Sequence, residues 1–213
     1  ILSLFVVSLV GLVAFVLVEN RAEEPILPMY LFKNKTFTLL NGIGFLMSLG
    51  MFGAIMFVPL FMQGIVGISA SESGTIMTPM MFAMIFTSIL AGQLVRRVGI
   101  RTQMIVGMAV MSFGFYLLST MTIETTNLQA MTDMIILGLG MGLVMPLLTL
   151  ALQEAFPKSE LGVVTSSSQF FRQIGGTFGM TILGAVMNHK SSTLLSNQLL
   201  PTLDKLPPQL HEM

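Results

Sequence analysis

The stretch Gly92-Gln93-Leu94-Val95-Arg96-Arg97-Val98-Gly99-Ile100-Arg101 decides the fold of this 213-residue chain. It is a short basic turn between two apolar runs, residues 75–95 and 104–121. Each run is about as long as the roughly 20 residues that a helix needs to cross the hydrocarbon of a bilayer. Because basic connections between spans stay on the cytoplasmic side, this turn sets the direction in which the chain threads a membrane.

The composition indicates an integral membrane protein. Hydrophobic residues make up 54% of the chain and charged residues only 9%, which leaves more apolar surface than a soluble fold of this length can bury. Ten Lys or Arg balance ten Asp or Glu, so the net charge gives no sign of a nucleic-acid partner. Cysteine is absent and both histidines lie in a polar C-terminal tail, so we expect neither a metal nor another cofactor.

Six apolar segments are predicted to be membrane-spanning helices, because hydrocarbon offers unpaired backbone groups no water and the alternating pattern of a β-barrel is absent. They cover residues 1–18, 37–65, 75–95, 104–121, 130–152 and 163–187. The second segment would reach about 43 Å at the helical rise, so it must tilt, kink near Pro59 or extend into the headgroups. Since the chain begins inside an apolar segment without Met, we expect a fragment of a larger protein.

Basic residues fall in alternate connections between these segments. Seven Lys or Arg lie in the connections 19–36, 92–101 and 153–162, and none lies in 66–74 or 122–129. The first three connections are therefore predicted to share the cytoplasmic face. The resulting organisation is a helix over 1–18, a cytoplasmic loop over 19–36, five spans within 37–187 and a polar external tail over 188–213. Three prolines in the tail predict short amphipathic turns there.

Segment 163–187 gathers its polar residues on one stripe. At 100° per residue, this stripe contains Gln169, Arg172, Gln173, Gly176 and Met180. An arginine in mid-span costs about 2.5 to 3.5 kcal/mol on insertion scales, so a partner or water must stabilise Arg172. Either this arginine lines a translocation cavity or it locks helix packing.

The second segment also carries a partly polar face, which could equally be a cavity wall or a packing surface. That face contains Asn41, Gly44, Ser48, Phe52, Pro59 and Gln63. From the two segments together, the residues predicted to line a substrate cavity are Asn41, Gln63, Gln169, Arg172 and Gln173.

Small residues predict where helices approach closely or bend. They are Gly138, Gly140, Gly142 and Pro146 in the fifth segment and Gly175, Gly176 and Gly179 in the sixth. Asp133 is the only carboxylate placed deep enough in a span to be a candidate for proton coupling, and a solvated position at the headgroup level is the favoured alternative.

The basic turn resembles the G-x-L-x-D-R-x-G-R-R loop of the major facilitator superfamily. The matching residues are Gly92, Leu94, Arg97, Gly99 and Arg101. Arg96 stands at the acidic position, as is usual for the second copy of this loop, so we expect the turn to anchor the cytoplasmic interface rather than to switch. Four further motifs narrow the resemblance to the fourteen-helix drug:proton antiporters of the EmrB/QacA type. These are Pro25-x-Leu27 before Leu31-Phe32-Lys33-Asn34-Lys35-x-Phe37, Gln63-x-x-x-Gly67, Gly138-x-Gly140-x-Gly142, and Arg172-Gln173-x-Gly175-Gly176-x-x-Gly179.

This resemblance implies an all-α polytopic bundle, the second half of the major facilitator fold with its last helix missing. It implies proton-driven export of drugs or other amphipathic molecules by alternating access in a bacterial inner membrane. The implied partners are the lipid bilayer, the substrate and protons, the missing N-terminal half and periplasmic adaptor proteins. An exporter or importer of a metabolite, peptide or fatty acid is the alternative within transport, and a membrane sensor or scaffold is the alternative outside it. An enzyme is not expected, because the spans contain no His/Glu metal pattern and no Ser-His-Asp set.

Overall fold

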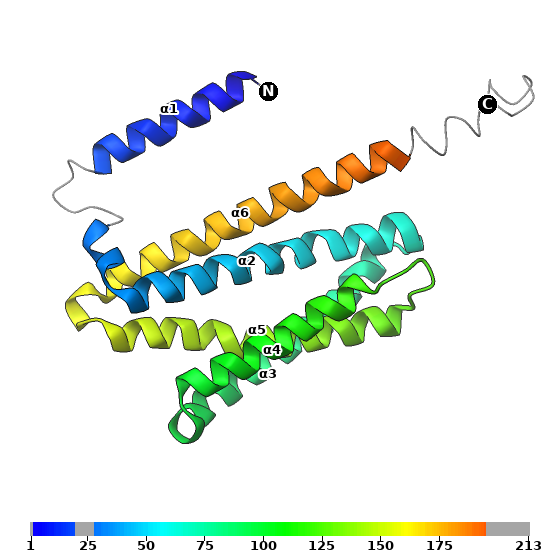
Figure 1. Ribbon diagram of the computed structural model, residues 1–213. Coiled ribbons are helices and arrows are strands. Elements are labelled where there is room, and N and C mark those ends of the chain that lie inside the picture. Colours follow the sequence, from blue (N-terminus) through cyan, green and yellow to red (C-terminus); the bar gives the residue numbers. More distant parts are fainter. Residues whose placement is uncertain (1, 20–27, 195–213) are drawn as a thin grey trace, which may run out of the picture.

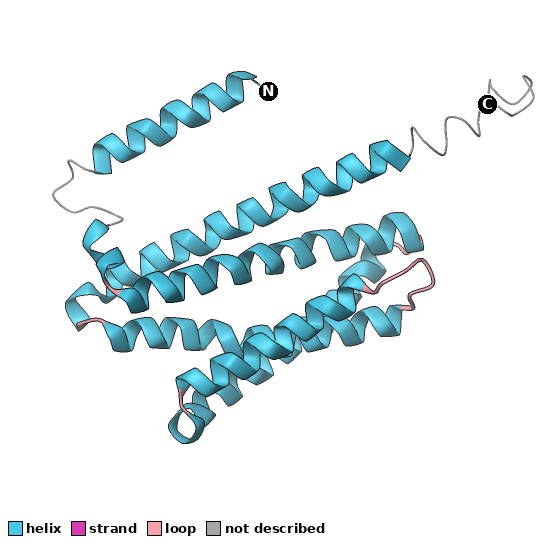
Figure 2. Cartoon of the chain, viewed as in Figure 1, coloured by secondary structure: helices cyan, strands magenta, loops and turns pink. Residues whose placement is uncertain are grey.

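The computed structural model describes residues 2–19 and 28–194, and every regular element within these residues is helical (Figures 1 and 2). The six α-helices are α1 (Leu2–Glu19), α2 (Lys35–Phe61), α3 (Ala70–Val98), α4 (Ile100–Ser119), α5 (Asn127–Ala155) and α6 (Leu161–Leu194). Short 3-10 turns cover Met29–Lys33 and Lys158–Glu160, and a π-helical turn covers Met62–Val66. The predicted all-α helical membrane bundle is confirmed.

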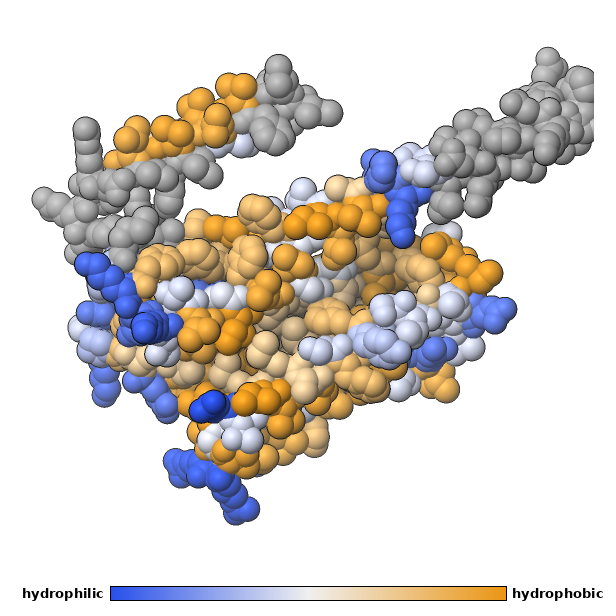
Figure 3. All heavy atoms as spheres, in the orientation of Figure 1, coloured by the Kyte–Doolittle hydropathy of each residue, from blue (hydrophilic) through white to orange (hydrophobic). Residues whose placement is uncertain are grey.

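Four stretches within the described residues are long and apolar enough to cross a membrane. They are Lys35–Val66, Ala70–Val98, Ile100–Ser119 and Asn127–Ala155. Apolar side chains cover most of the visible face of the bundle, while hydrophilic ones gather towards its ends (Figure 3). This distribution suits a surface solvated by hydrocarbon. The more polar α6 is not in this set, and membrane crossing by α1 and α6 stays a prediction.

The helices extend beyond the apolar runs that predicted them, because polar residues cap and continue them. α3 begins at Ala70 rather than at residue 75, since the Ser69 hydroxyl accepts a hydrogen bond from the Glu72 N–H and the Glu72 carboxylate accepts one from the Ser69 N–H. Such a capping box satisfies N–H groups that the first turn leaves without helical partners. α2 likewise begins at Lys35, inside the segment predicted as a cytoplasmic loop.

The predicted start of the polar tail at residue 188 needs a correction. α6 continues to Leu194, and near its end the Ser192 hydroxyl donates to the His189 carbonyl over 2.9 Å. The seven residues 188–194 therefore belong to a helix rather than to short separate turns. Polar residues do not stop a helix that an apolar segment has already nucleated. The prediction for 195–213 lies outside the described residues.

The basic turn is shorter than the sequence pattern indicates. α3 runs to Val98 and α4 starts at Ile100, so Gly99 alone separates them. Its φ of 77° lies in the left-handed region that glycine tolerates without steric cost. Gly92, Leu94 and Arg97 consequently lie in the last turns of α3, and Arg101 lies in the first turn of α4. Cations near the C-terminal carbonyls of a helix, such as Arg96 and Arg97 on α3, are stabilised by its dipole.

The three basic connections lie at the same end of the bundle. Thr36, Arg101 and Glu154 line one groove of about 710 Å³ between the ends of α2, α4 and α5. The ring of Phe37 at the start of α2 also makes an edge contact with Phe156 after α5, with ring centroids 5.9 Å apart. The assignment of this end to the cytoplasm stays a prediction.

The end of α2 is not a plain kink at Pro59. Proline lacks an N–H, so the carbonyl four residues earlier loses its helical donor and the register downstream can relax. The chain passes into the π-helical turn Met62–Val66, which ends at Gly67 with a φ of 83°. The Gln63 amide then donates to the Ser73 hydroxyl over 2.7 Å and links this turn to the start of α3. The second segment thus ends in a π-turn that its apolar pattern did not indicate.

Helix α5 packs closely between α3 and α4 because its glycines face both neighbours. A Cβ added at Gly138 would meet the Met80 carbonyl of α3, whereas one added at Gly140 would lie 2.6 Å from the Met111 nitrogen of α4. Gly142 again faces α3, beside Met84. Glycines two residues apart point in directions about 200° apart around the helix axis, so α5 can approach both of its neighbours closely.

A second close interface joins α2 and α6. A Cβ at Gly175 would meet the Phe45 carbonyl, one at Gly179 would meet the Leu49 carbonyl, and one at Gly176 would meet the Phe52 ring. In Figure 1, α2 and α6 run side by side across the bundle, while α3, α4 and α5 form the neighbouring group. The bundle is therefore built from a glycine-packed pair and a glycine-packed trio.

Candidate functional site

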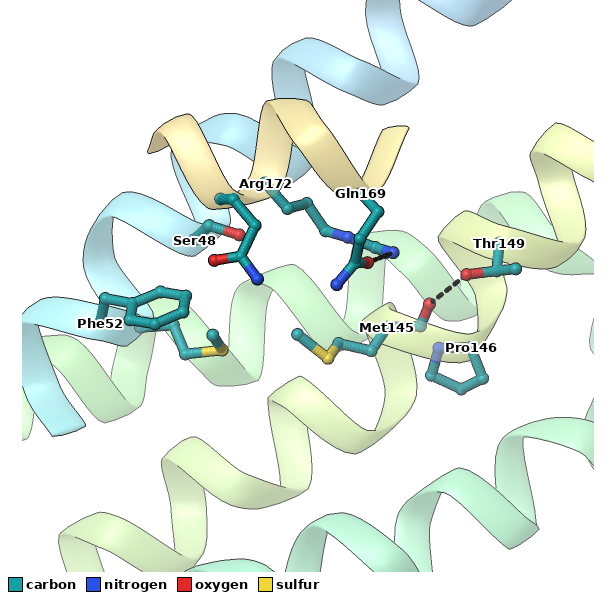
Figure 4. A pocket seen from close by; sticks show the side chains of 9 residues that line it. Ser48, Phe52, Met145, Pro146, Thr149, Gln169 and Arg172 are labelled. Atoms are coloured by element: carbon teal, nitrogen blue, oxygen red, sulfur yellow. Dashed lines mark hydrogen bonds between the residues drawn. The ribbon is translucent and has the colours of Figure 1, made fainter. Parts of the chain in front are cut away.

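A pocket of about 410 Å³ lies where the α2–α6 pair meets α5 (Figure 4). Three residues from each helix line it: Ser48, Met51 and Phe52 from α2, Met145, Pro146 and Thr149 from α5, and Gln169, Arg172 and Gln173 from α6. Ser48 and Phe52 stand on either side of the middle of the stretch Lys35–Val66. The pocket thus lies near the middle of the bundle and combines apolar walls with hydrogen-bonding groups.

The polar stripe of α6 supplies the charged group of the pocket. Gln169, Arg172 and Gln173 stand at spacings of three and four residues, which place their side chains on one helix face. The Arg172 guanidinium donates a hydrogen bond to the side-chain oxygen of Gln169, as Figure 4 shows. Arg172 itself is half-buried. The Gln169 amide oxygen therefore accepts a hydrogen bond from a guanidinium that has five N–H donors in all.

The stem of Arg172 rests on the backbone of α2 at Gly44. A Cβ built on Gly44 would lie 3.3 Å from Cγ and 3.7 Å from Cδ of Arg172. An aliphatic arginine stem commonly packs on an apolar surface while its head reaches a polar environment. The missing side chain at position 44 thus provides the space through which Arg172 reaches the pocket.

Ser48 brings an unused hydroxyl to the same pocket. Its side chain is fully buried, and its Oγ has no hydrogen-bond partner among the described residues. A buried hydroxyl without a partner costs free energy, and a ligand or water that bonds it would remove that cost.

The α5 wall is shaped by Pro146. A proline at this position leaves the Gly142 carbonyl without its helical donor. The Ser88 hydroxyl of α3 donates to that carbonyl over 3.1 Å and replaces the lost bond. On the next turn the Thr149 hydroxyl donates to the Met145 carbonyl over 3.5 Å, drawn as a dashed line in Figure 4. The proline can therefore line the pocket without leaving the carbonyl it frees unpaired.

The structure brings together three of the five predicted cavity residues: Gln169, Arg172 and Gln173. Asn41 is buried outside this pocket, and its amide donates to the Phe37 carbonyl over 2.8 Å. Gln63 lines a separate pocket of about 490 Å³ beside the π-turn. The two residues share a helix face, but 22 residues of helix separate them by about 33 Å, too far for one ligand-sized pocket.

Sequence reasoning singled out Pro146 of α5 only for bending, and it missed the other α5 residues of the pocket and Met51 of α2. Ser48 and Phe52 stood on the predicted polar face of the second segment, and the structure places both in the pocket. Met51, Met145 and Thr149 carried no comparable signal, because one methionine among 20 and one threonine in an apolar helix are not distinctive. Only knowledge of which helices pack together could have selected them.

Asp133 lies elsewhere, on α5 outside the pocket. It is 4% exposed, and its Oδ2 has no hydrogen-bond partner among the described residues. Neighbouring protein therefore covers this side chain, and a role of Asp133 in proton coupling stays a prediction.

Residues 2–19 and 28–194 contain no group of three His, Cys, Asp or Glu side chains that could hold a metal ion.

Long apolar helices around a central pocket that contains an arginine are typical of one class of protein, the polytopic membrane transporters. The Major Facilitator Superfamily profile matches residues 1–180, so the chain belongs to that superfamily. The predicted membership of this superfamily is thereby confirmed, and the chain is of the transporter type rather than an enzyme.

Several curated relatives are similar to this chain over most of its length. It is 68% identical over 209 residues to the "Multidrug transporter protein MdtP" of Bacillus subtilis (strain 168), covering 98% of this chain and 39% of the relative. It is 32% identical over 197 residues to the "Multidrug resistance protein 3" of the same strain, and the match covers 92% of this chain and 38% of the relative. It is also 32% identical over 188 residues to a "Tetracycline resistance determinant" of Streptomyces rimosus, and the match covers 87% of this chain and 54% of the relative. The chain thus spans about two fifths to one half of the length of these relatives.

Proposed function

We propose that the chain belongs to a proton-driven exporter of drugs or similar amphipathic molecules in a bacterial cell membrane. The observation that carries this proposal is the pocket between α2, α5 and α6, whose apolar walls and few convergent polar groups suit a small amphipathic ligand. The printed names of three relatives, which refer to multidrug transport, multidrug resistance and tetracycline resistance, support the same substrate class.

The position of the pocket supports transport by alternating access. A transporter of this kind holds its substrate near the bilayer midplane and exposes it to either side by rocking one group of helices against another. Here the pocket lies on the junction between the α2–α6 pair and the α3–α4–α5 trio. The opposing wall would come from the remaining part of the transporter.

Efflux measurements on the full-length protein test this function. Cells that lack their own drug exporters are loaded with tetracycline or ethidium, and energised efflux is compared with that of an empty-vector control. We expect efflux only with the transporter, and we expect a protonophore to stop it. Efflux that survives collapse of the proton gradient would reject proton coupling. Absence of export for every drug in a broad panel would reject the exporter and leave a metabolite, peptide or fatty-acid transporter.

Asp133→Asn is expected to weaken proton coupling. Asparagine keeps the size of the buried side chain but cannot bind and release a proton in the physiological range. We therefore expect drug binding to be retained, while drug accumulation in everted vesicles driven by an acid-inside pH gradient falls about a hundredfold, at the lower end of the range typical for a lost proton-transfer group. Thr132→Ser, at an exposed neighbouring position, is the control. Normal gradient-driven accumulation in Asp133→Asn would remove this carboxyl from the coupling mechanism.

A further inference from the structure

The pocket carries a single formal charge, and that charge is positive. Arg172 is the only ionisable side chain among its nine described lining residues, and the other polar groups are the neutral side chains of Ser48, Thr149, Gln169 and Gln173. Within the described residues, no carboxylate pairs with Arg172, and its hydrogen-bond partner is the Gln169 amide. This part of the transporter therefore provides donors and a cation but no anion.

An arginine in such a place needs a complementary group. A half-buried cation surrounded by apolar side chains is stabilised only weakly by one neutral amide, and a planar guanidinium pairs best with a carboxylate or a similar group through two parallel hydrogen bonds. The buried Ser48 hydroxyl is a further donor without a partner among the described residues. Both groups line the same pocket (Figure 4).

We propose that the pocket selects amphipathic ligands that carry an anionic head, which Arg172 binds while Met51, Phe52 and Met145 cover the apolar body. This inference rests on the proposed exporter function and narrows its substrate class. It disfavours a transporter that accepts only cations, because a cation in this pocket would lie close to the Arg172 guanidinium, and none of the described lining residues carries a negative charge.

Gly44 is the positioning residue for this interaction. The stem of Arg172 crosses α2 at the place where a side chain on residue 44 would stand, with Cγ only 3.3 Å from the added Cβ. Alanine at this position would push the stem by a few tenths of an ångström, and we expect this to weaken the placement of the guanidinium beside Gln169. Gly42 lies on the same helix, and a Cβ added there meets nothing within 4 Å, so it provides a matched control.

Three fluorescent probes with the same aromatic body separate head charge from hydrophobicity. Pyrenebutyrate is anionic, pyrenebutanol is neutral, and pyrenebutyl-trimethylammonium is cationic. The full-length protein, expressed in cells without other exporters, is tested for energised efflux of each probe, and membrane levels are checked by immunoblot. We expect wild-type protein to export the carboxylate fastest. Arg172→Gln should lower carboxylate efflux about tenfold, as expected for loss of a charge-assisted hydrogen bond, while efflux of the cation should rise because the like charge is removed.

The remaining variants distinguish recognition from a structural role. Arg172→Lys keeps the charge but loses the planar fork, so it should restore part of the carboxylate efflux. Gly44→Ala should lower the apparent affinity for the carboxylate several-fold, and Gly42→Ala should behave as wild type. An equal loss for all three probes in Arg172→Gln would overturn the inference, since it would indicate that the arginine pairs with a carboxylate elsewhere in the transporter or holds the fold.

The wild-type results separate the inference from the function on which it rests. Export of the cation or the alcohol without export of the carboxylate would overturn the inference and leave the exporter function standing. Failure to export any probe, together with failure to export tetracycline or ethidium, would reject the exporter function itself.

Discussion

Gly138→Ala in the full-length protein should lower the midpoint of thermal unfolding by about 2 °C or more. Alanine gains about 1 kcal/mol of helix propensity over glycine, which by itself would stabilise α5. The added Cβ, however, would meet the carbonyl and the Cα of Met80 on α3. Overpacking against side chains already costs about 1 to 3 kcal/mol, and backbone atoms cannot rotate away. With the overpacking cost at the upper end of its range, the net loss is about 2 kcal/mol, which corresponds to about 4 to 8 °C for 150 to 250 residues and to a smaller shift for a longer protein.

Circular dichroism or dye-monitored unfolding in detergent measures this midpoint. Gly74→Ala is the matched control, because a Cβ added at Gly74 on α3 meets nothing within 4 Å. We expect its unfolding midpoint to stay the same or to rise slightly through helix propensity. Equal midpoints for Gly138→Ala and the wild type would show that α3 and α5 can separate at no cost.

Gly179→Ala should reduce drug efflux about tenfold while the protein still reaches the membrane. The added Cβ would meet the carbonyl of Leu49, whose Cα would lie only 2.8 Å away, so α6 must move away from α2. Ser48, directly before Leu49, and Gln173 on α6 both line the pocket. A shift of one helix therefore alters the distances between groups that must contact the same ligand, and a loss of about 1.4 kcal/mol in binding lowers affinity tenfold.

The control for Gly179→Ala is an alanine at Gly184, which lies further along the same helix, α6. A Cβ at Gly184 would make only an ordinary contact, 3.7 Å from the Phe57 ring, so Gly184→Ala should leave efflux unchanged. Efflux normalised to membrane-inserted protein and the concentration for half-maximal efflux are the readouts. Wild-type efflux in Gly179→Ala would show that the distance between α2 and α6 does not govern the pocket.

Hydropathy and basic loop residues were sufficient to predict the six helical segments and their order. They could not predict the ends of the helices, because a helix continues while its backbone bonds are satisfied, whether or not its side chains are apolar. The capping box at Ser69 and Glu72 is visible in the sequence and would have placed the start of α3 correctly. The π-turn after Phe61 has no such signal, since it depends on how Gln63 meets Ser73 across a connection.

The sequence predicted the residues of α6 that line the pocket, but only some of those that line it from α2 and α5. The spacing of Gln169, Arg172 and Gln173 places them on one face whatever surrounds α6, so periodicity alone identifies them. The opposite walls depend on which helices meet at that depth, and a single sequence contains no distance between helices. Asn41 and Gln63 illustrate the difference, because both satisfy the face rule, but Asn41 bonds the Phe37 carbonyl and Gln63 lines a separate pocket beside the π-turn.

The two-residue spacing of glycines in α5 has a consequence for directed evolution of this protein. Gly138, Gly140 and Gly142 each touch backbone or side-chain atoms of a neighbour, so random libraries will lose most variants at these positions through misassembly. Gln169 and Gln173, which line the pocket from α6, are instead exposed. A library restricted to Gln169, Gln173 and the α2 wall would therefore explore new ligand ranges on an intact scaffold, and the α5 glycines should be held constant in any such search.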